Sequence, residues 1–139
     1  MGMIYAEIEL INSDDMAFYK RKMLDKEKIR RETVKALVDS GAYMLCINEH
    51  IKTQLGLDVY ETREAVLADG EIKTFEIAGP IDVNFKNRST TCRAMVLPGK
   101  SEVLLGSIPL EDMDVVIDPK AQTMDINPES PYMAMTYLK

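Results

Sequence analysis

One carboxylate in this sequence stands where an apolar, strand-like run ends in a tight turn. Asp39 follows the apolar residues 36–38, and Ser40, Gly41 and Ala42 come directly after it. The hydroxyl can hydrogen-bond the carboxylate, and the glycine allows backbone to approach it closely. Such a carboxylate could activate a water molecule by accepting its proton. The motif occurs once, so chemistry that needs two such carboxylates would require a second copy of the chain.

By itself, Asp-Ser-Gly is a weak signal, because Asp and Ser often bond the local backbone of turns that have no catalytic role. The surroundings of the motif are more informative. It lies between two apolar strand patterns, at residues 33–38 and 43–47. A hairpin signal, Ala68-Asp69-Gly70, follows about 30 residues later, and the apolar-apolar-Gly run Leu104-Leu105-Gly106 precedes a short helical pattern. These features together favour a functional site around Asp39 over an ordinary turn.

The rest of the sequence is dominated by strand patterns separated by frequent turns. Asn48 and Gly56 predict the two ends of a short helix over residues 49–55. Asp69-Gly70 predicts a tight hairpin turn within residues 66–73. Further strands are predicted at residues 4–11, 81–85, 92–97, 103–105, 115–117 and 124–126, and a short helix at 110–113. The pattern predicts an all-β domain, a small closed barrel with one or two short helices.

Composition limits the classes of function. A chain of 139 residues can form one domain with a core, and 46% apolar with 29% charged residues is ordinary for a soluble protein. The net charge of −6 argues against nucleic acid as a partner. No apolar stretch approaches the ~20 residues of a membrane span, and the N-terminus becomes acidic too early for a signal peptide. We therefore expect a cytoplasmic protein, with Cys46 and Cys92 as buried, reduced thiols rather than a disulfide.

With these motifs in this order, the sequence resembles the retroviral-like (retropepsin-like) aspartic proteases, in particular their small prokaryotic single-domain members. The resemblance runs from about Met3 to Asn127. It implies a protease domain over residues 1–127, with a charged excursion at 13–32 that could be a helical turn or a long loop. Residues 128–139 would form a C-terminal tail.

The resemblance also assigns roles to residues. Asp39 would be the catalytic carboxylate, and the hairpin tip would be the flap that closes over the substrate. The other implied positions are the active-site loop, Ser40, Gly41 and Ala42; the flap tip, Ala68, Asp69 and Gly70; and the element that supports the loop, Leu104, Leu105 and Gly106.

Two carboxylates about 3 Å apart cannot both ionise cheaply, so one can accept a proton from water while the other donates to the peptide carbonyl. The single motif therefore predicts a homodimer with Asp39 of each subunit on the twofold axis. The expected activity is an aspartic-type endopeptidase acting on peptide or protein substrates. Two alternatives remain open: a non-catalytic peptide-binding or scaffold module on the same fold, and an unrelated β protein in which Asp-Ser-Gly is only a turn.

Other motifs are weaker. Pro98-Gly99-Lys100-Ser101 imitates the end of a phosphate-binding loop, but Ala94 stands where that motif requires glycine. His50 is the only histidine, and no second histidine or cysteine pair accompanies it. We therefore predict no metal and no cofactor.

Overall fold

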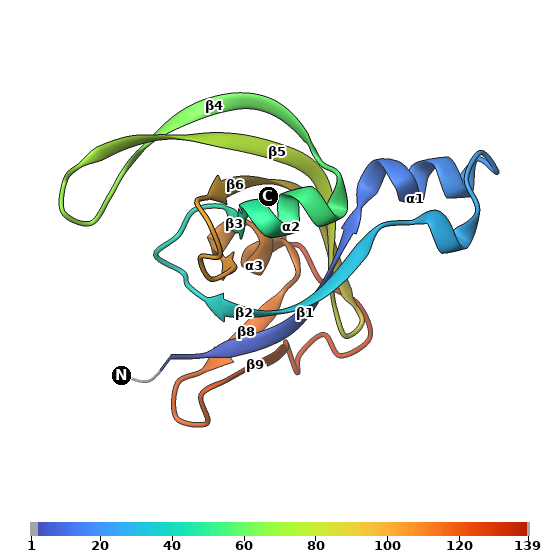
Figure 1. The fold of residues 1–139 in the computed structure, drawn as a ribbon. Coiled ribbons are helices and arrows are strands. Elements are labelled where there is room, and N and C mark those ends of the chain that lie inside the picture. Colours follow the sequence, from blue (N-terminus) through green and yellow to red (C-terminus); the bar gives the residue numbers. More distant parts are fainter. Residues whose placement is uncertain (1–2, 139) are drawn as a thin grey trace.

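The computed structural model of the protein describes residues 3–138, so Met1, Gly2 and Lys139, at the outer ends of the predicted domain and tail, lie outside it. Most elements of the described chain are β-strands (Figure 1). In chain order the elements are β1 (Tyr5–Asn12), α1 (Ser13–Lys20), a 3-10 turn (Lys26–Lys28), β2 (Arg31–Val38), β3 (Leu45–Asn48), α2 (Glu49–Leu55), β4 (Asp58–Val66), β5 (Ile72–Phe85), β6 (Arg88–Leu97), β7 (Leu104–Leu105), α3 (Ser107–Asp112), β8 (Val115–Asp118) and β9 (Thr123–Ile126).

The main sheet closes on itself. Its strand order is β1-β2-β7-β3-β6-β5-β4, and β1 pairs with β5 as well as with β2. The strands other than β4 therefore form a ring, and β4 is attached to the outside of β5. A register shift between Ala78 and Ile81 lets the long strand β5 pass from the hairpin with β4 into the ring. The predicted closed, mostly β architecture is thus confirmed.

The interior of the ring is filled by alternate residues of its strands, as the period of two in a strand requires. Burying one large aliphatic side chain of this kind contributes about 1.5–3 kcal/mol. Helix α2 covers the core with Ile51 and Leu55. The fully buried large aliphatic side chains that the strands contribute to this core are Ile8, Leu10, Leu45, Ile47, Ile81, Val83 and Leu105.

The predicted charged excursion is partly helical. Helix α1 begins after Asn12, whose side-chain oxygen accepts the Asp15 backbone N–H at 3.0 Å. Asp15 in turn accepts the Arg30 backbone N–H at 3.0 Å and its guanidinium at 2.9 and 3.0 Å, which clamps the helix to the start of β2. These bonds from Arg30 lower the pKa of the Asp15 carboxyl below its ordinary value. The described chain therefore has three short α-helices where the sequence predicted one or two.

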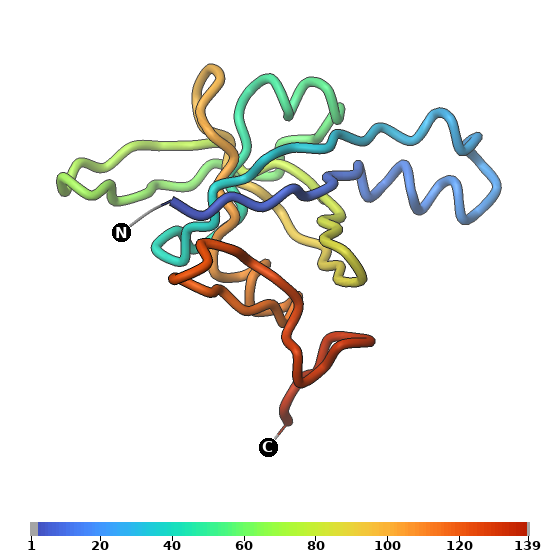
Figure 2. Tube along the Cα trace, turned by 90° about the horizontal axis from the view of Figure 1, so that it is seen from below, coloured from blue at the N-terminus to red at the C-terminus, as the bar shows by residue number. Residues whose placement is uncertain are grey.

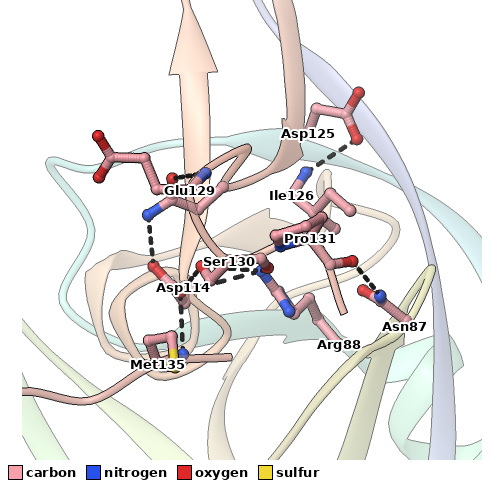
Figure 3. Close-up of polar contacts among 10 residues, drawn as sticks. Asn87, Arg88, Asp114, Asp125, Ile126, Glu129, Ser130, Pro131 and Met135 are labelled. Atoms are coloured by element: carbon pink, nitrogen blue, oxygen red, sulfur yellow. Dashed lines mark hydrogen bonds and ion pairs between the residues drawn. The ribbon is translucent and has the colours of Figure 1, made fainter. Parts of the chain in front are cut away.

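The predicted C-terminal tail is anchored to the domain. Asp114, which follows α3, accepts the Ser130 hydroxyl and the Met135 backbone N–H at 3.0 Å (Figure 3). These bonds, with one from the side chain of Asn127, lower the pKa of the Asp114 carboxyl to about 2. The buried Arg88 guanidinium donates to the Ser130 carbonyl oxygen. Beyond this anchor the chain projects away from the body of the domain (Figure 2).

Strands β8 and β9 form a separate two-stranded antiparallel sheet. Across the described residues, every helix is too short or too polar to cross a membrane.

Candidate active site

Asp39 lies in the loop that follows β2, and the backbone of that loop holds it. Its own N–H donates to the Leu105 carbonyl oxygen at 3.0 Å, and its carbonyl oxygen accepts the Ala42 N–H at 3.1 Å. Its carboxylate oxygen Oδ1 accepts the Gly41 N–H at 3.0 Å. The side chain is half-buried, whereas Ser40 and Gly41 are exposed. One face of the carboxylate is thus fixed by the chain while the residue stays accessible.

Gly41 is needed because the loop folds tightly over the carboxylate. A Cβ atom at this position would stand 3.1 Å from Asp39 Oδ1, closer than most carbon atoms come to a neighbour. The Ser40 hydroxyl forms no hydrogen bond with any other residue that the structure describes, although the sequence suggested a bond to the carboxylate. The backbone of Gly41, rather than the Ser40 side chain, orients Asp39 within one chain.

Strand β7 supports the loop from behind. It is inserted between β2 and β3, with Leu104 opposite Leu37 and Cys46, and Leu105 opposite Val38. Leu105 is fully buried, and its carbonyl oxygen is the acceptor for the Asp39 N–H. The structure therefore brings the two predicted segments together, although they are far apart in the sequence.

Gly106 allows the loop to pass next to β7. A Cβ atom here would overlap the Met44 carbonyl oxygen and lie 2.8 Å from the Ala42 carbonyl oxygen. The first turn of α3 then holds the same segment: the Ser107 N–H donates to the Ala42 oxygen at 2.8 Å, and the next N–H donates to the Tyr43 oxygen at 3.0 Å. These contacts fix the path of residues 42–44.

The predicted flap is the hairpin of β4 and β5. Its tip, Ala68-Asp69-Gly70, is closed by hydrogen bonds of 2.8 Å from the Gly70 N–H to the Leu67 oxygen and from the Leu67 N–H to the Glu71 oxygen. Gly70 has φ +86°, a left-handed conformation that favours glycine. The hairpin extends well beyond the ring (Figure 1), and no hydrogen bond among the described residues joins its tip to Asp39.

An open pocket of about 380 Å³ adjoins Asp39. Asp39 is the only ionisable side chain that lines it, and most of the other lining side chains are apolar. Two of them are notably open to solvent, Met3 with 67% and Ile117 with 38% of its surface exposed. The other lining residues are Ile4, Leu37, Val38, Ser40 and Pro119.

A second open pocket, of about 260 Å³, begins directly after the Asp39 loop. It is lined by residues 43–45, by Arg63 of β4, by Cys92 and Arg93 of β6, and by Ile108 of α3. Neither arginine was predicted as a site residue: Arg63 lies in β4, which has no apolar alternation that would mark it as a strand, and Arg93 lies in the predicted strand at 92–97 with no motif around it. The only available signal in the sequence was the positive charge of Arg63, shortly before the predicted hairpin at residues 66–73.

Both thiols are unpaired, and Cys46 is buried as predicted, whereas Cys92 is only half-buried. Burial raises the pKa of Cys46 to about 11, with a smaller effect from the charge of Asp39, and raises that of Cys92 to about 12. Neither is therefore a ready nucleophile at neutral pH. Among residues 3–138, no three His, Cys, Asp or Glu side chains are grouped so that they could hold a metal ion.

Comparison with known proteins relates most of the chain to one family of proteases. The model of the family described as "gag-polyprotein putative aspartyl protease" matches residues 26–112, which include the Asp39 loop, the hairpin and β7. No curated protein matches the chain. Among solved structures, the retroviral protease-like domain of Ddi1 from Leishmania major is similar, with a TM-score of 0.55 and 22% sequence identity over 92% of this chain and 90% of that one.

Proposed function

This chain belongs to the gag-polyprotein aspartyl protease family and has the retropepsin-like fold, and on this basis we propose that it is an aspartic-type endopeptidase. Its substrates would be peptides or proteins, and the carboxylates of two Asp39 residues, one from each subunit of a homodimer, would activate the attacking water.

The observation that carries the proposal is the environment of Asp39. Its Oδ1 is held by the Gly41 N–H at 3.0 Å, while the residue remains half-exposed beside an open pocket. A held carboxylate of this kind can accept a proton from water. A second carboxylate close by would raise the pKa of one member of the pair, which could then donate its proton to the peptide carbonyl. The two pKa values would belong to the pair rather than to either residue.

We expect the second carboxylate to come from a partner copy, and this is supported by the lining of the pocket, in which Asp39 is the only acid. The same pocket is lined by two exposed apolar side chains, Met3 and Ile117. A second copy that covered them would bury apolar surface and bring its own Asp39 to the site, as an isologous interface requires.

The proposal is tested by mixing subunits. Wild-type protein and an Asp39→Asn variant are incubated together and assayed with a diverse peptide library between pH 3 and pH 8. If each site needs two Asp39 residues and subunits exchange, a fourfold excess of the variant should reduce cleavage per wild-type subunit to about one fifth. The variant alone should be inactive.

The outcomes separate the candidate functions. Cleavage by Asp39→Asn alone would refute the mechanism, and activity that is unaffected by the excess variant would refute the shared site. If neither protein cleaves any peptide but both bind peptides tightly, the chain is a peptide-binding or scaffold module rather than an enzyme.

A further inference from the structure

The second pocket, lined by residues 43–45, Arg63, Cys92, Arg93 and Ile108, has a charge that the proposed peptidase activity does not require. We call it the arginine pocket. It is open to solvent, with a volume of about 260 Å³, and both ionised side chains that line it are cationic. In a protein with net charge −6, a concave site with this lining is distinctive.

One carboxylate is shared between the two arginines. Glu61 Oε1 lies 3.1 Å from Arg63 Nη2 and 3.3 Å from Arg93 Nη1. The two guanidinium groups and the Glu61 carboxylate together carry a net charge of +1. The acidic side chains of α3, Glu111 and Asp112, line a neighbouring hollow that shares Ile108 with this pocket, and the charge of Asp112 acts on Cys92; neither acid pairs with Arg63 or Arg93 among the described residues. The arginine pocket therefore has donors to spare for one more carboxylate.

The two guanidinium groups are held in position without being buried. Arg63 Nη1 contacts the Met44 sulfur at 3.4 Å, and Arg93 lies 5.7 Å from the centre of the Tyr60 ring. Their side chains are 39% and 40% exposed, so a ligand can still reach them. Groups that are partly ordered before binding lose less conformational entropy when a ligand arrives.

The pocket lies between the segment that follows the Asp39 loop and the first strand of the predicted flap. Its wall at residues 43–45 continues directly from the Asp39 loop, and Arg63 belongs to the strand that leads to the hairpin tip at Ala68-Asp69-Gly70. An extended peptide advances about 3.3 Å per residue. A peptide held between the loop and the hairpin would therefore place a side chain a few residues from the scissile bond at this pocket.

We propose that the arginine pocket binds a carboxylate of the substrate and so makes Arg63 and Arg93 determinants of specificity. This inference rests on the proposed peptidase activity. The carboxylate is an Asp or Glu side chain, or the C-terminus of a short peptide, since both offer the same two oxygens to an arginine.

The test compares cleavage of matched peptides. C-terminally amidated peptides carry Glu, Gln or Lys at each of four positions on either side of the cleaved bond, and a free-acid set varies only the terminus. At one position Glu should exceed Gln by about fivefold in kcat/KM, the size expected for half-exposed charges, and the advantage should shrink as salt is raised. If free-acid peptides are cleaved faster than amidated ones while Glu and Gln side chains are cleaved equally, the bound carboxylate is the C-terminus of the peptide.

Substitutions of the two arginines test whether the pocket causes the preference for Glu over Gln. Arg63→Met should abolish the preference, Arg63→Lys should retain part of it, and Arg63→Glu should favour Lys. Arg31→Met is the matched control, because Arg31 also pairs with a glutamate, at 3.2 Å, and is 42% exposed, but lies in β2 outside the pocket. Arg93→Met provides a second test if Arg63 variants unfold.

Each outcome decides between the two claims. Cleavage without an acidic preference, or a preference that survives both Arg63→Met and Arg93→Met, would overturn this inference and leave the peptidase proposal standing. The absence of cleavage of every peptide would overturn both.

Discussion

Replacing Gly106 with alanine tests whether β7 fixes the path of the Asp39 loop. The added Cβ would overlap the Met44 carbonyl oxygen and stand 2.8 Å from that of Ala42. Both are backbone atoms, so they cannot swing aside as the end of a long side chain could. Relief of the clash has to move the loop away from α3, and that motion breaks the hydrogen bonds of 2.8 and 3.0 Å from Ser107 and Ile108.

The cost can be estimated from these contacts. Overpacking costs about 1–3 kcal/mol, and each lost hydrogen bond costs about 1 kcal/mol. Together they lower the free energy of unfolding by about 3–5 kcal/mol. With an unfolding entropy of about 2.1 cal/mol/K per residue, Tm should fall by about 10–17 °C for a chain of this size.

Thermal and urea unfolding of the wild type and Gly106→Ala would measure this loss. Gly99→Ala is the control, because Gly99 also lies in a loop, has φ +63° and has no atom within 4 Å of its Cβ position. That variant should lose only the backbone strain of about 1–2 kcal/mol. Equal losses of stability in the two variants would refute the argument that Gly106 is required by contact with the loop.

Three further predictions concern the site and its supports. Gly41→Ala, with its Cβ 3.1 Å from Asp39 Oδ1, should reduce kcat/KM for peptide cleavage by at least about tenfold while Tm changes little, because small displacements of reacting groups are costly; full activity would show that Gly41 does not position the carboxylate. The pKa of Asp114 is about 2 in the folded protein, below its ordinary value of 3.8, so its stabilising effect is complete above about pH 4 and is lost as the pH falls towards 2. Asp114→Asn should therefore lower Tm at pH 7 but not near pH 2, and a pH-independent difference would contradict the linkage. Because the pKa values of Cys46 and Cys92 are raised to about 11 and about 12, a thiol reagent at pH 8 should label the native protein far more slowly than the urea-unfolded chain; equal rates would show that the thiols are not protected.

Elements that carry their own end signals could be predicted from the sequence. Helix α2 has the bounds that Asn48 and Gly56 indicated: the Asn48 side chain accepts the Ile51 N–H at 2.9 Å, and Gly56 has φ +62°. The turn at Asp69-Gly70 was found for the same reason, since Gly70 adopts the positive φ that such turns need. Local backbone chemistry is enough to specify these features.

Elements defined by distant partners could not be predicted in this way. Strand β4 is almost entirely exposed, so it shows no apolar alternation, and only its pairing with β5 makes it a strand. The predicted strand at 43–47 begins at Leu45, because Tyr43 and Met44 are held in the loop by α3 and β7. Arg88 lies outside the predicted strands at 81–85 and 92–97, yet it is buried and bonded to Ser130, which is 42 residues away in the sequence.

The position of β7 in the chain has a consequence for biosynthesis. A nascent polypeptide carries Asp39 early, but the strand that holds the Asp39 N–H and the helix that fixes the following residues are translated much later. The ring itself cannot close until β5 has emerged to meet β1. Pairing between such distant segments forms slowly. The geometry around Asp39 is therefore completed only after most of the chain has left the ribosome, so incomplete translation products would lack the hydrogen bonds that hold the Asp39 loop.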